Sequence, residues 1–496
     1  MNIKEAKKEI KNTVKAYLAK DEAGMYQIPA IRQRPVLLMG PPGIGKTQII
    51  EQVARECQVA LVSYTITHHT RQSAVGLPCI KEESYDGKLY SVTEYTMSEI
   101  IASIYEKMKQ TGLTEGILFI DEINCVSETL APTMLQFLQC KTFGNQKVPE
   151  GWIIVAAGNP PEYNKSVREF DMVTWDRVRR IDIMADYTIW REYAREAKVH
   201  SALLSYLELR PKNFYRIEAD VDGLQFVTAR GWEDLSNLMD AYEKLQIPVT
   251  KEVVEEFIHY EDVAEDVAAY LELYQKYQDD YGVEDILQGQ VSTEVYQRLY
   301  QAAFDERLSV VHLLLDGLLR NIRSFLSQKA LTDEWYAFLK EYRKQVEDAK
   351  DTKDCYLSLL EQSIQELEHK KAAGFCQKEE EQTKRQLFTL LRQYQPAASA
   401  AKEAFEEAKQ GFAIQREALN QTKQDAIQSL EYAFDFMEEA FPAGEEMVVF
   451  VTELTISSES TRFFLEYPCE RYLQYSEKLL IGTRRRELLS ELEERE

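Results

Sequence analysis

The clearest candidate chemistry in the chain is a glycine-rich segment, GPPGIGKT, which matches the pattern G-x-x-x-x-G-K-[ST] in full. It follows an apolar run at 36–39 and leads into a helical pattern at 47–57. Backbone N–H groups of such a loop surround phosphate oxygens, and the N-terminus of the next helix adds partial positive charge. We expect Lys46 to reach the β- and γ-phosphates of a nucleotide and Thr47 to bind Mg²⁺ through its hydroxyl. The residues expected to bind the nucleotide here are Gly40, Pro41, Pro42, Gly43, Ile44, Gly45, Lys46, Thr47 and Gln48.

Two carboxylates, Asp121 and Glu122, end a second apolar run, GILFID at 116–121. Strand ends open onto the crevice where α/β sheets bind ligands. We expect Asp121 to complete the Mg²⁺ shell through water and Glu122 to polarise the attacking water. Taken alone, the pair could equally be a solvated turn, but the phosphate-binding pattern upstream favours the catalytic interpretation.

A third apolar run, WIIVAAG at 152–158, ends at Asn159. An amide at this place can hold water near the γ-phosphate. The following Pro160 and Pro161 are otherwise typical of an ordinary turn. The position of Asn159 at a strand end is therefore the main argument for its function.

These residues require a sheet that brings several strand ends together. The apolar runs are continuous rather than alternating, which is typical of parallel strands buried on both faces. They alternate with helical patterns, and this predicts an α/β fold. An amphipathic helix is expected within the first 20 residues, and a hairpin turn is expected at Asp86–Gly87. The expected strands are VLLM (36–39), VALVSY (59–64), GILFID (116–121) and WIIVAAG (152–158).

The rest of the chain is predicted to be largely helical, because no proline occurs between Pro248 and Pro396. Apolar residues step by three and four along 357–367 and again along 401–430. This spacing favours an antiparallel coiled-coil-like hairpin over about 345–440, with an ordinary helical bundle as the alternative. The expected domains are an α/β nucleotide-binding core (1–186), a small helical lid (187–250), a helical region containing the hairpin (251–440) and a C-terminal segment whose fold the sequence leaves open (441–496).

The charge of the chain is concentrated in its second half. Residues 1–250 hold 30 basic and 33 acidic side chains, whereas residues 251–496 hold 29 basic and 50 acidic ones. The net charge of −24 therefore comes mostly from the second half, which disfavours nucleic acid as a partner. Solubility of a large helical surface is the plainer explanation. No apolar run is long enough for a membrane span, and seven scattered cysteines without an export signal point to the reducing cytoplasm.

With these motifs in this order, the chain resembles the MoxR-type AAA+ ATPases, in the group that includes the chelatase motor subunits. The resemblance covers about residues 30–250 and rests on GPPGIGKT, DEIN at 121–124, AAGNP at 156–160 and WDRVRRIDI at 175–183. It implies ATP and Mg²⁺ as cofactors and a ring, most simply a homo-hexamer. It also implies a partner protein with a von Willebrand factor A domain, which the ring would remodel or mature.

The resemblance assigns roles to several polar residues. Asn159 matches the sensor-1 residue, and Arg230 matches the sensor-2 arginine, although this chain reads T-A-R where the family has S-P-R or S-A-R. Arg177 best matches the arginine finger that completes a neighbouring subunit's site. The family motif is a shorter D-R-F, so Arg179 and Arg180 remain alternatives, and a simple basic surface is a third interpretation.

Two further questions stay open at this stage. The segment 67–78 follows the second expected strand, so His68, His69 and Arg71 are candidates for substrate or intersubunit contact, or else belong to a structural connection. The main alternative to an ATP-driven remodeller is a slow nucleotide-dependent switch that acts through the acidic helical arm. A nucleic-acid translocase is a third hypothesis, which the charge disfavours.

Overall fold

The computed structural model describes residues 1–479 apart from 69–70, 144–145, 164–169, 171, 221–222, 348–350 and 443. The chain divides into two compact units. The first unit comprises Met1–Ile189, Thr228–Arg230 and Gln365–Gln377, and the second comprises Trp190–Val227, Gly231–Ile364 and Lys378–Glu496.

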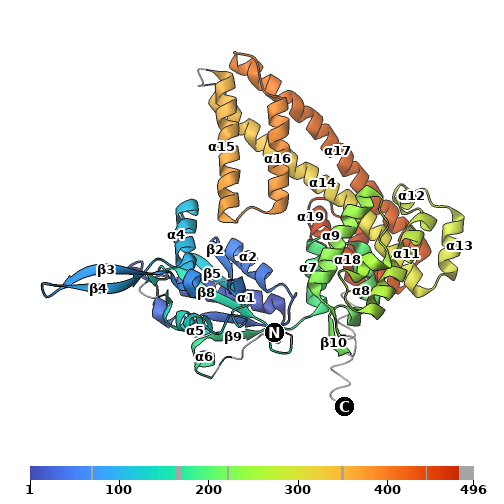
Figure 1. The fold of residues 1–496 in the computed structure, drawn as a ribbon. Coiled ribbons are helices and arrows are strands. Elements are labelled where there is room, and N and C mark those ends of the chain that lie inside the picture. Colours follow the sequence, from blue (N-terminus) through green and yellow to red (C-terminus); the bar gives the residue numbers. More distant parts are fainter. Residues whose placement is uncertain are drawn as a thin grey trace. The chain divides into compact units, whose positions relative to one another are not determined.

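A five-stranded sheet forms the middle of the first unit (Figure 1). Its strand order is β2-β5-β8-β1-β9, and all neighbouring strands run parallel. The four apolar runs expected to be strands form β1, β2, β5 and β8, so the predicted α/β core with a parallel sheet is confirmed. The strands are β1 (Val36–Met39), β2 (Ala60–Thr65), β5 (Gly116–Asp121), β8 (Trp152–Gly158) and β9 (Arg179–Asp182).

Successive side chains of the strands β1, β2, β5 and β8 point into two different hydrophobic clusters, one on each face of the sheet. In β1, Val36 and Leu38 belong to one cluster, whereas Leu37 belongs to the other. All four residues of β1 are buried because helices cover both faces, and this explains the continuously apolar sequence. The first cluster is covered by α1 (Ile3–Leu18) and α2 (Lys46–Cys57), and the second by α4 (Glu99–Thr111) and α5 (Ala131–Cys140).

The N-terminal amphipathic helix and the expected hairpin are both present. In α1, Ile10 and Val14 are buried against the sheet, and Asn2 starts the helix in a capping box with Glu5. The hairpin turns at Asp86–Gly87, where both residues have positive φ as tight two-residue turns require. It consists of β3 (Pro78–Tyr85) and β4 (Lys88–Tyr95); the smaller elements of this unit are η1 (Ala30–Arg32), η2 (Ile66–His68), α3 (Arg71–Val75), β6 (Thr142–Phe143), β7 (Gln146–Lys147) and α6 (Met172–Arg177).

The segment expected to be a wholly helical lid also contains a β-hairpin. Its strands, β10 (Arg216–Asp220) and β11 (Gly223–Val227), pair antiparallel. Each strand is five residues long, too short for its alternation to stand out in the sequence. The helices of this segment are α7 (Tyr187–Glu196), α8 (Ser201–Leu209), the short η3 (Pro211–Asn213) and α9 (Ala229–Leu245).

The second half is largely helical, as predicted. The apolar run at 447–451 belongs to the C-terminal segment whose fold the sequence left open, and it lies in helix α18. None of the helices in the described part of the chain is both long and apolar enough to cross a membrane. The remaining helices are α10 (Lys251–Glu255), α11 (Glu261–Tyr281), α12 (Val283–Leu287), α13 (Thr293–Gln301), α14 (Phe304–Val346), α15 (Thr352–Ala373), α16 (Lys378–Gln393), α17 (Ala401–Ala440), α18 (Glu445–Ile456) and α19 (Ser458–Glu466).

The pairing of the long helices differs from the expected hairpin over 345–440. The principal partner of α17 is α14, which begins ahead of that range. Phe412 packs edge-on against Trp335, whereas Ser429 accepts a hydrogen bond from Asn321, so the two helices run antiparallel. The apolar residues along 357–367 lie instead in α15, whose Tyr356 hydroxyl donates to the Leu391 carbonyl of α16. Helical spacing identifies an apolar face but does not specify its partner, so this part of the prediction was wrong.

A buried polar network joins five helices of the second unit. Glu208 of α8 accepts hydrogen bonds from Arg191 of α7 at 2.8 Å and from His312 of α14 at 3.1 Å. Arg195 of α7 pairs with both Glu208 and the buried Glu453 of α18. Burial raises the pKa of Glu453.

The same network continues from His312 through hydroxyl groups. His312 Nδ1 lies 2.8 Å from the Ser205 hydroxyl, which lies 2.6 Å from the Tyr270 hydroxyl, and this in turn lies 3.0 Å from the Ser309 hydroxyl. It therefore ties the lid helices α7 and α8 to α11, α14 and α18.

Candidate nucleotide-binding site

Three strand ends carry the predicted site residues to one edge of the sheet. In the strand order, β8 lies between β1 and β5. The glycine-rich loop follows β1, Asp121 ends β5 with Glu122 directly after it, and Asn159 follows β8. Because the strands are parallel, their carboxyl ends meet, and Asn159 lies between the loop and the carboxylates.

The loop after β1 has the geometry of a phosphate-binding loop. Gly43 and Gly45 adopt positive φ values of 72° and 89°, which few other residues tolerate. Gly40 is also restricted, because a Cβ there would lie 2.7 Å from the Ile183 carbonyl oxygen. Helix α2 begins at Lys46 directly after Gly45, which has no side chain to cap it. Its first backbone N–H groups are therefore directed at whatever lies in the loop, and an anion suits them.

The Lys46 ammonium lies at the centre of the site. Its Nζ donates hydrogen bonds at 2.8 Å to the carbonyls of Gly40 and Pro41 and to Oδ1 of Asn159. Burial lowers the pKa of Lys46 to about 8, against the opposing effect of Asp121. The nearby positive charge of Arg230 lowers this pKa further. A phosphate group would stabilise the charged form of Lys46 and offset the cost of its burial.

The residues expected to hold Mg²⁺ are adjacent. Thr47 Oγ1 donates to Asp121 Oδ2 at 3.0 Å. A hydroxyl and a carboxylate are the hard oxygen donors that Mg²⁺ prefers when it also binds phosphates and water, so these side chains fit the ion. The next residue, Glu122, has a positive φ of 55°, and its N–H donates to Asp121 Oδ1 at 2.9 Å. The two oxygens of Asp121 are therefore held by different groups, one by the Thr47 hydroxyl and the other by the Glu122 N–H.

Arg230 and its neighbour Thr228 meet the phosphate-binding loop at the start of α9. The Arg230 N–H donates to the Gly43 carbonyl at 3.2 Å. A Cβ added to Gly43 would lie 3.0 Å from Thr228, so this loop and the start of α9 pack closely. The Arg230 side chain is exposed and electrostatically coupled to Lys46. It is therefore placed to contact a phosphate bound in the loop.

Residues 36–175 match the family model described as "ATPase family associated with various cellular activities (AAA)". This part of the chain is an AAA ATPase domain. The match contains β1, the phosphate-binding loop, the Asp121–Glu122 turn and Asn159, which are the elements that meet at the sheet edge.

A solved structure, the FIGL-1 AAA domain in complex with ADP, is similar at 16% sequence identity and a TM-score of 0.30. That similarity covers 56% of this chain and 87% of the other. No curated protein matches the chain.

The three arginines proposed as the finger follow the matched residues 36–175 and have different surroundings in the first unit. Arg179 of β9 donates to Thr13 Oγ1 at 2.7 Å and pairs with Glu9, so it holds helix α1. Arg180 pairs with Asp182 at 2.7 Å and stacks over the Trp175 ring. Arg177, at the end of α6, is exposed and makes no hydrogen bond or ion pair with any residue that the structure describes. Among the residues that the structure describes, Arg179 and Arg180 thus have ion-pair partners and Arg177 has none.

The segment suggested for substrate or intersubunit contact is only partly described. His68 ends η2 and Arg71 begins α3, on the way from β2 to the β3–β4 hairpin. His69 lies outside the described residues. The structure therefore leaves their proposed contacts as hypotheses.

Two residues of the AAA domain and its adjoining helix were missed from the sequence. Asn124 donates a hydrogen bond to the backbone of Asn159 at 2.7 Å, and Thr228 packs on Gly43. The signal for Asn124 was its place in the DEIN motif, two residues after Glu122. Thr228 precedes Arg230 by two residues, and the signal for it was its place as the first residue of the T-A-R motif.

A cluster of ligand-type side chains in the second unit is better explained as a hydrogen-bonded pair than as a metal site. The ligand atoms of His200, Asp240 and Glu243 lie within 4.8 Å of one another. However, His200 Nδ1 accepts the Ala202 N–H at 3.2 Å, and Nε2 lies 2.8 Å from Glu243 Oε1. A ring that accepts at Nδ1 carries its proton on Nε2, so neither nitrogen has a lone pair left for a metal.

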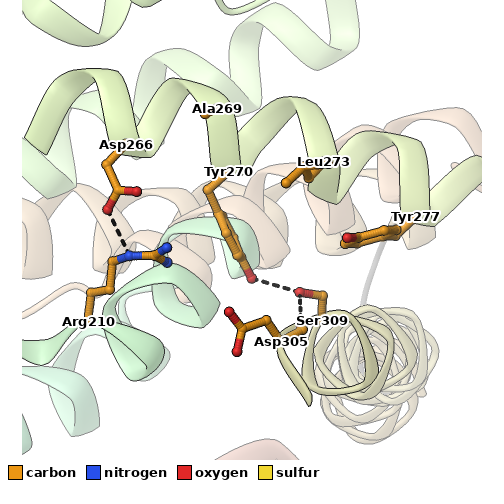
Figure 2. A pocket seen from close by; sticks show the side chains of 8 residues that line it. All are labelled: Arg210, Asp266, Ala269, Tyr270, Leu273, Tyr277, Asp305 and Ser309. Carbon is orange, nitrogen blue, oxygen red and sulfur yellow. Dashed lines mark hydrogen bonds and ion pairs between the residues drawn. The ribbon is translucent and has the colours of Figure 1, made fainter. Parts of the chain in front are cut away.

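Figure 2 shows a pocket of about 110 Å³ in the second unit, lined by residues of α11 and α14 and by Arg210. Its polar side chains largely bind one another: Arg210 pairs with Asp266 at 2.8 Å, and Tyr270 bonds Ser309 at 3.0 Å. The pocket is smaller than the roughly 300 Å³ at which small-molecule sites begin. The nucleotide site of the AAA domain is therefore the better candidate for chemistry.

The lowered pKa of Lys46 predicts how nucleotide affinity depends on pH. Phosphates favour the charged form, so the pKa of Lys46 rises on binding, and affinity is highest below pH 8. Between pH 7 and pH 9 the affinity for ATP should fall roughly tenfold, because each pH unit above the pKa of the free site costs about a factor of ten. Fluorescence titration with ATP in the absence of Mg²⁺ measures this directly. Lys46→Arg is the control, since arginine stays charged and should show a flat profile.

Proposed function

We propose that the chain is an ATP-hydrolysing ring motor of the MoxR type, which remodels or matures a partner protein. The observation that carries the proposal is the convergence of Lys46, Thr47, Asp121, Glu122 and Asn159 at one sheet edge of an AAA ATPase domain. Each has the chemistry that phosphoryl transfer requires at its place.

In this proposal each residue of the site has a separate role in ATP hydrolysis. Lys46 leaves its carbonyl partners to hold the β- and γ-phosphates, while Thr47 and Asp121 hold Mg²⁺, which when bound offsets phosphate charge. Glu122 orients a water for attack on the γ-phosphorus and accepts its proton as the bond to the leaving ADP oxygen breaks. Asn159 holds the same water or a γ-phosphate oxygen.

The exposed position of Arg177 supports the proposal of a ring. Negative charge develops on the phosphate oxygens in the transition state of hydrolysis. A cation on the far side of the γ-phosphate stabilises that transition state. Arg177 is exposed and without a partner among the described residues, as a residue that serves a neighbouring subunit should be. We therefore assign it as the arginine finger of a homo-hexamer in which every site is shared.

The proposed motor transmits motion through α9. The first turn of this helix, with Arg230, contacts the phosphate-binding loop, and the rest of the same helix belongs to the second unit. Within that unit the buried network joins α7 and α8 to α14. A change of nucleotide sensed at Arg230 would thus turn the lid and α14 together. With 43 residues, α14 is about 65 Å long, so a small rotation becomes a large displacement at its far end.

The proposal also includes a client and a compartment. A protein with a von Willebrand factor A domain is the proposed partner, since such proteins accompany MoxR-type motors. The excess of acidic residues in the second half suits a protein partner better than nucleic acid. All seven cysteines are free thiols, which agrees with the reducing cytoplasm as the proposed compartment.

The test of the proposal is ATP hydrolysis measured as a function of protein concentration, together with the mass of the protein in solution with and without ATP. Because each site needs a neighbour's Arg177, we expect turnover per subunit to rise with concentration and to level off when the ring has formed. Turnover that is slow and independent of concentration, with a monomeric mass in ATP, would instead support the alternative of a nucleotide-dependent switch acting through the acidic helical arm.

A further inference from the structure

We infer that Asn124 is a positioning residue for ATP hydrolysis, whose side-chain amide fixes the separation between Asn159 and the turn that carries Glu122. The inference rests on the proposed function, because it concerns the same site. It adds a residue that acts through two others, Glu122 and Asn159, to which the proposed function gives the contacts with water and nucleotide.

The geometry around Asn124 joins two strand ends. Asn124 is 2% exposed, and its Nδ2 donates to the carbonyl oxygen of Asn159 at 2.7 Å. The preceding Ile123 donates its N–H to the Ala157 carbonyl at 2.9 Å, beyond the last paired residues of β5 and β8. These two hydrogen bonds attach the turn after β5 to the end of β8. Glu122 lies in that turn, so its backbone is held at a fixed place relative to Asn159.

The amide of Asn124 becomes more important when nucleotide binds. Asn159 is held from two sides, its carbonyl by Asn124 and its side-chain Oδ1 by Lys46. A γ-phosphate competes with Oδ1 for the Lys46 ammonium. Once the Lys46 ammonium binds the phosphate, its hydrogen bond to Asn159 Oδ1 is lost, whereas the hydrogen bond from Asn124 to the Asn159 carbonyl persists. Asn159 then keeps its backbone position while its side chain is released toward the water.

The packing of Asn124 against Gly158 indicates a constrained position. A Cβ on Gly158 would lie 2.6 Å from Asn124 Oδ1, so the amide occupies the space of a side chain. Gly158 lies within β8 and its φ is not positive, so close approach rather than backbone conformation requires glycine there. Asn124 Oδ1 is buried and accepts no hydrogen bond from the described residues. A buried acceptor without a hydrogen bond lowers the stability of the fold, and an apolar side chain could fill the same space without that loss. A polar group in such a place is typical of functional sites.

The experiment compares three variants with wild type: Asn124→Ala, Gly158→Ala and the double variant. For each, we would measure kcat, the Kd for ATP, and the melting temperature. Asn124→Ala should lower kcat about 30-fold or more while the Kd for ATP changes less than threefold, because Lys46 and Thr47 are untouched. Gly158→Ala should lower both the melting temperature and kcat, because the new methyl group displaces the amide.

The double variant separates positioning from packing. The methyl group of the new alanine fits the space that the amide leaves, so the melting temperature should recover relative to Gly158→Ala while kcat stays low. Recovery of kcat together with the melting temperature would overturn the inference, as would a kcat for Asn124→Ala within threefold of wild type. A wild type without turnover would contradict the proposed function instead. A crystal structure of Asn124→Ala then still decides the inference: Asn159 should have moved away from Lys46, and an unmoved Asn159 overturns it.

Discussion

Replacing Glu122 by glutamine is expected to abolish ATP turnover while the protein still binds ATP. Glutamine keeps the shape of the side chain but cannot accept the proton of the attacking water, and such a loss costs about 10²- to 10⁴-fold in rate. Binding should persist because the phosphates are held by the loop and Lys46, and Mg²⁺ by Thr47 and Asp121. Single-turnover hydrolysis of radiolabelled ATP and a separate measurement of the Kd for ATP test both parts.

Glu128→Gln is the matched control for Glu122→Gln. Glu128 is an exposed glutamate six residues further along the chain, and the same substitution there should leave kcat within about twofold of wild type, as is usual for surface changes. If Glu122→Gln retained more than a tenth of wild-type turnover, Glu122 would not be the group that activates water. Loss of ATP binding in this variant would show instead that Glu122 helps to hold the metal or the phosphates.

The sequence predicted the α/β core because its signals are local. The phosphate-binding loop is contiguous, and each remaining group directly follows a buried apolar strand, so that strand order alone brings the groups together. Asn124 was harder to identify because its function depends on a hydrogen bond to Asn159, 35 residues away. Its side chain has no property, other than its place in DEIN, that distinguishes it from an asparagine in an ordinary turn.

The helical half shows why periodicity specifies a face but not a partner. The apolar residues of 357–367 and 401–430 predicted helices, which are present as α15 and α17. The choice of α14 as the partner of α17 depends on tertiary packing, in which Trp335 meets Phe412 and Asn321 meets Ser429. The buried network could not be predicted either. Arg195, Glu208 and Glu453 are ordinary charged residues in the sequence, and only the fold places them together and removes them from water.

Replacing Arg177 by alanine is expected to lower ATP turnover about 10³-fold, the smaller of the effects usual for an arginine finger. The reason is that the Arg177 side chain makes no hydrogen bond or ion pair with the described residues of its own chain, so its loss should leave the fold intact and remove a cation only from a neighbour's site. Arg179→Ala and Arg180→Ala are the controls. Arg179→Ala should lower the melting temperature, since Glu9 and Thr13 lose their partner, whereas Arg180→Ala should change turnover little.

Mixing the two inactive variants distinguishes a shared site from a self-contained one. In a ring that contains equal amounts of both, a working site needs a subunit with Glu122 next to one with Arg177. Random assembly gives this arrangement at about one site in four, so an equimolar mixture should recover about a quarter of wild-type turnover. A mixture that stays inactive while Arg177→Ala alone is also inactive would place Arg177 in its own subunit's site. Full activity of Arg177→Ala would instead indicate that Arg179 or Arg180 is the arginine finger. The ion pair of that arginine would then have to break when subunits assemble.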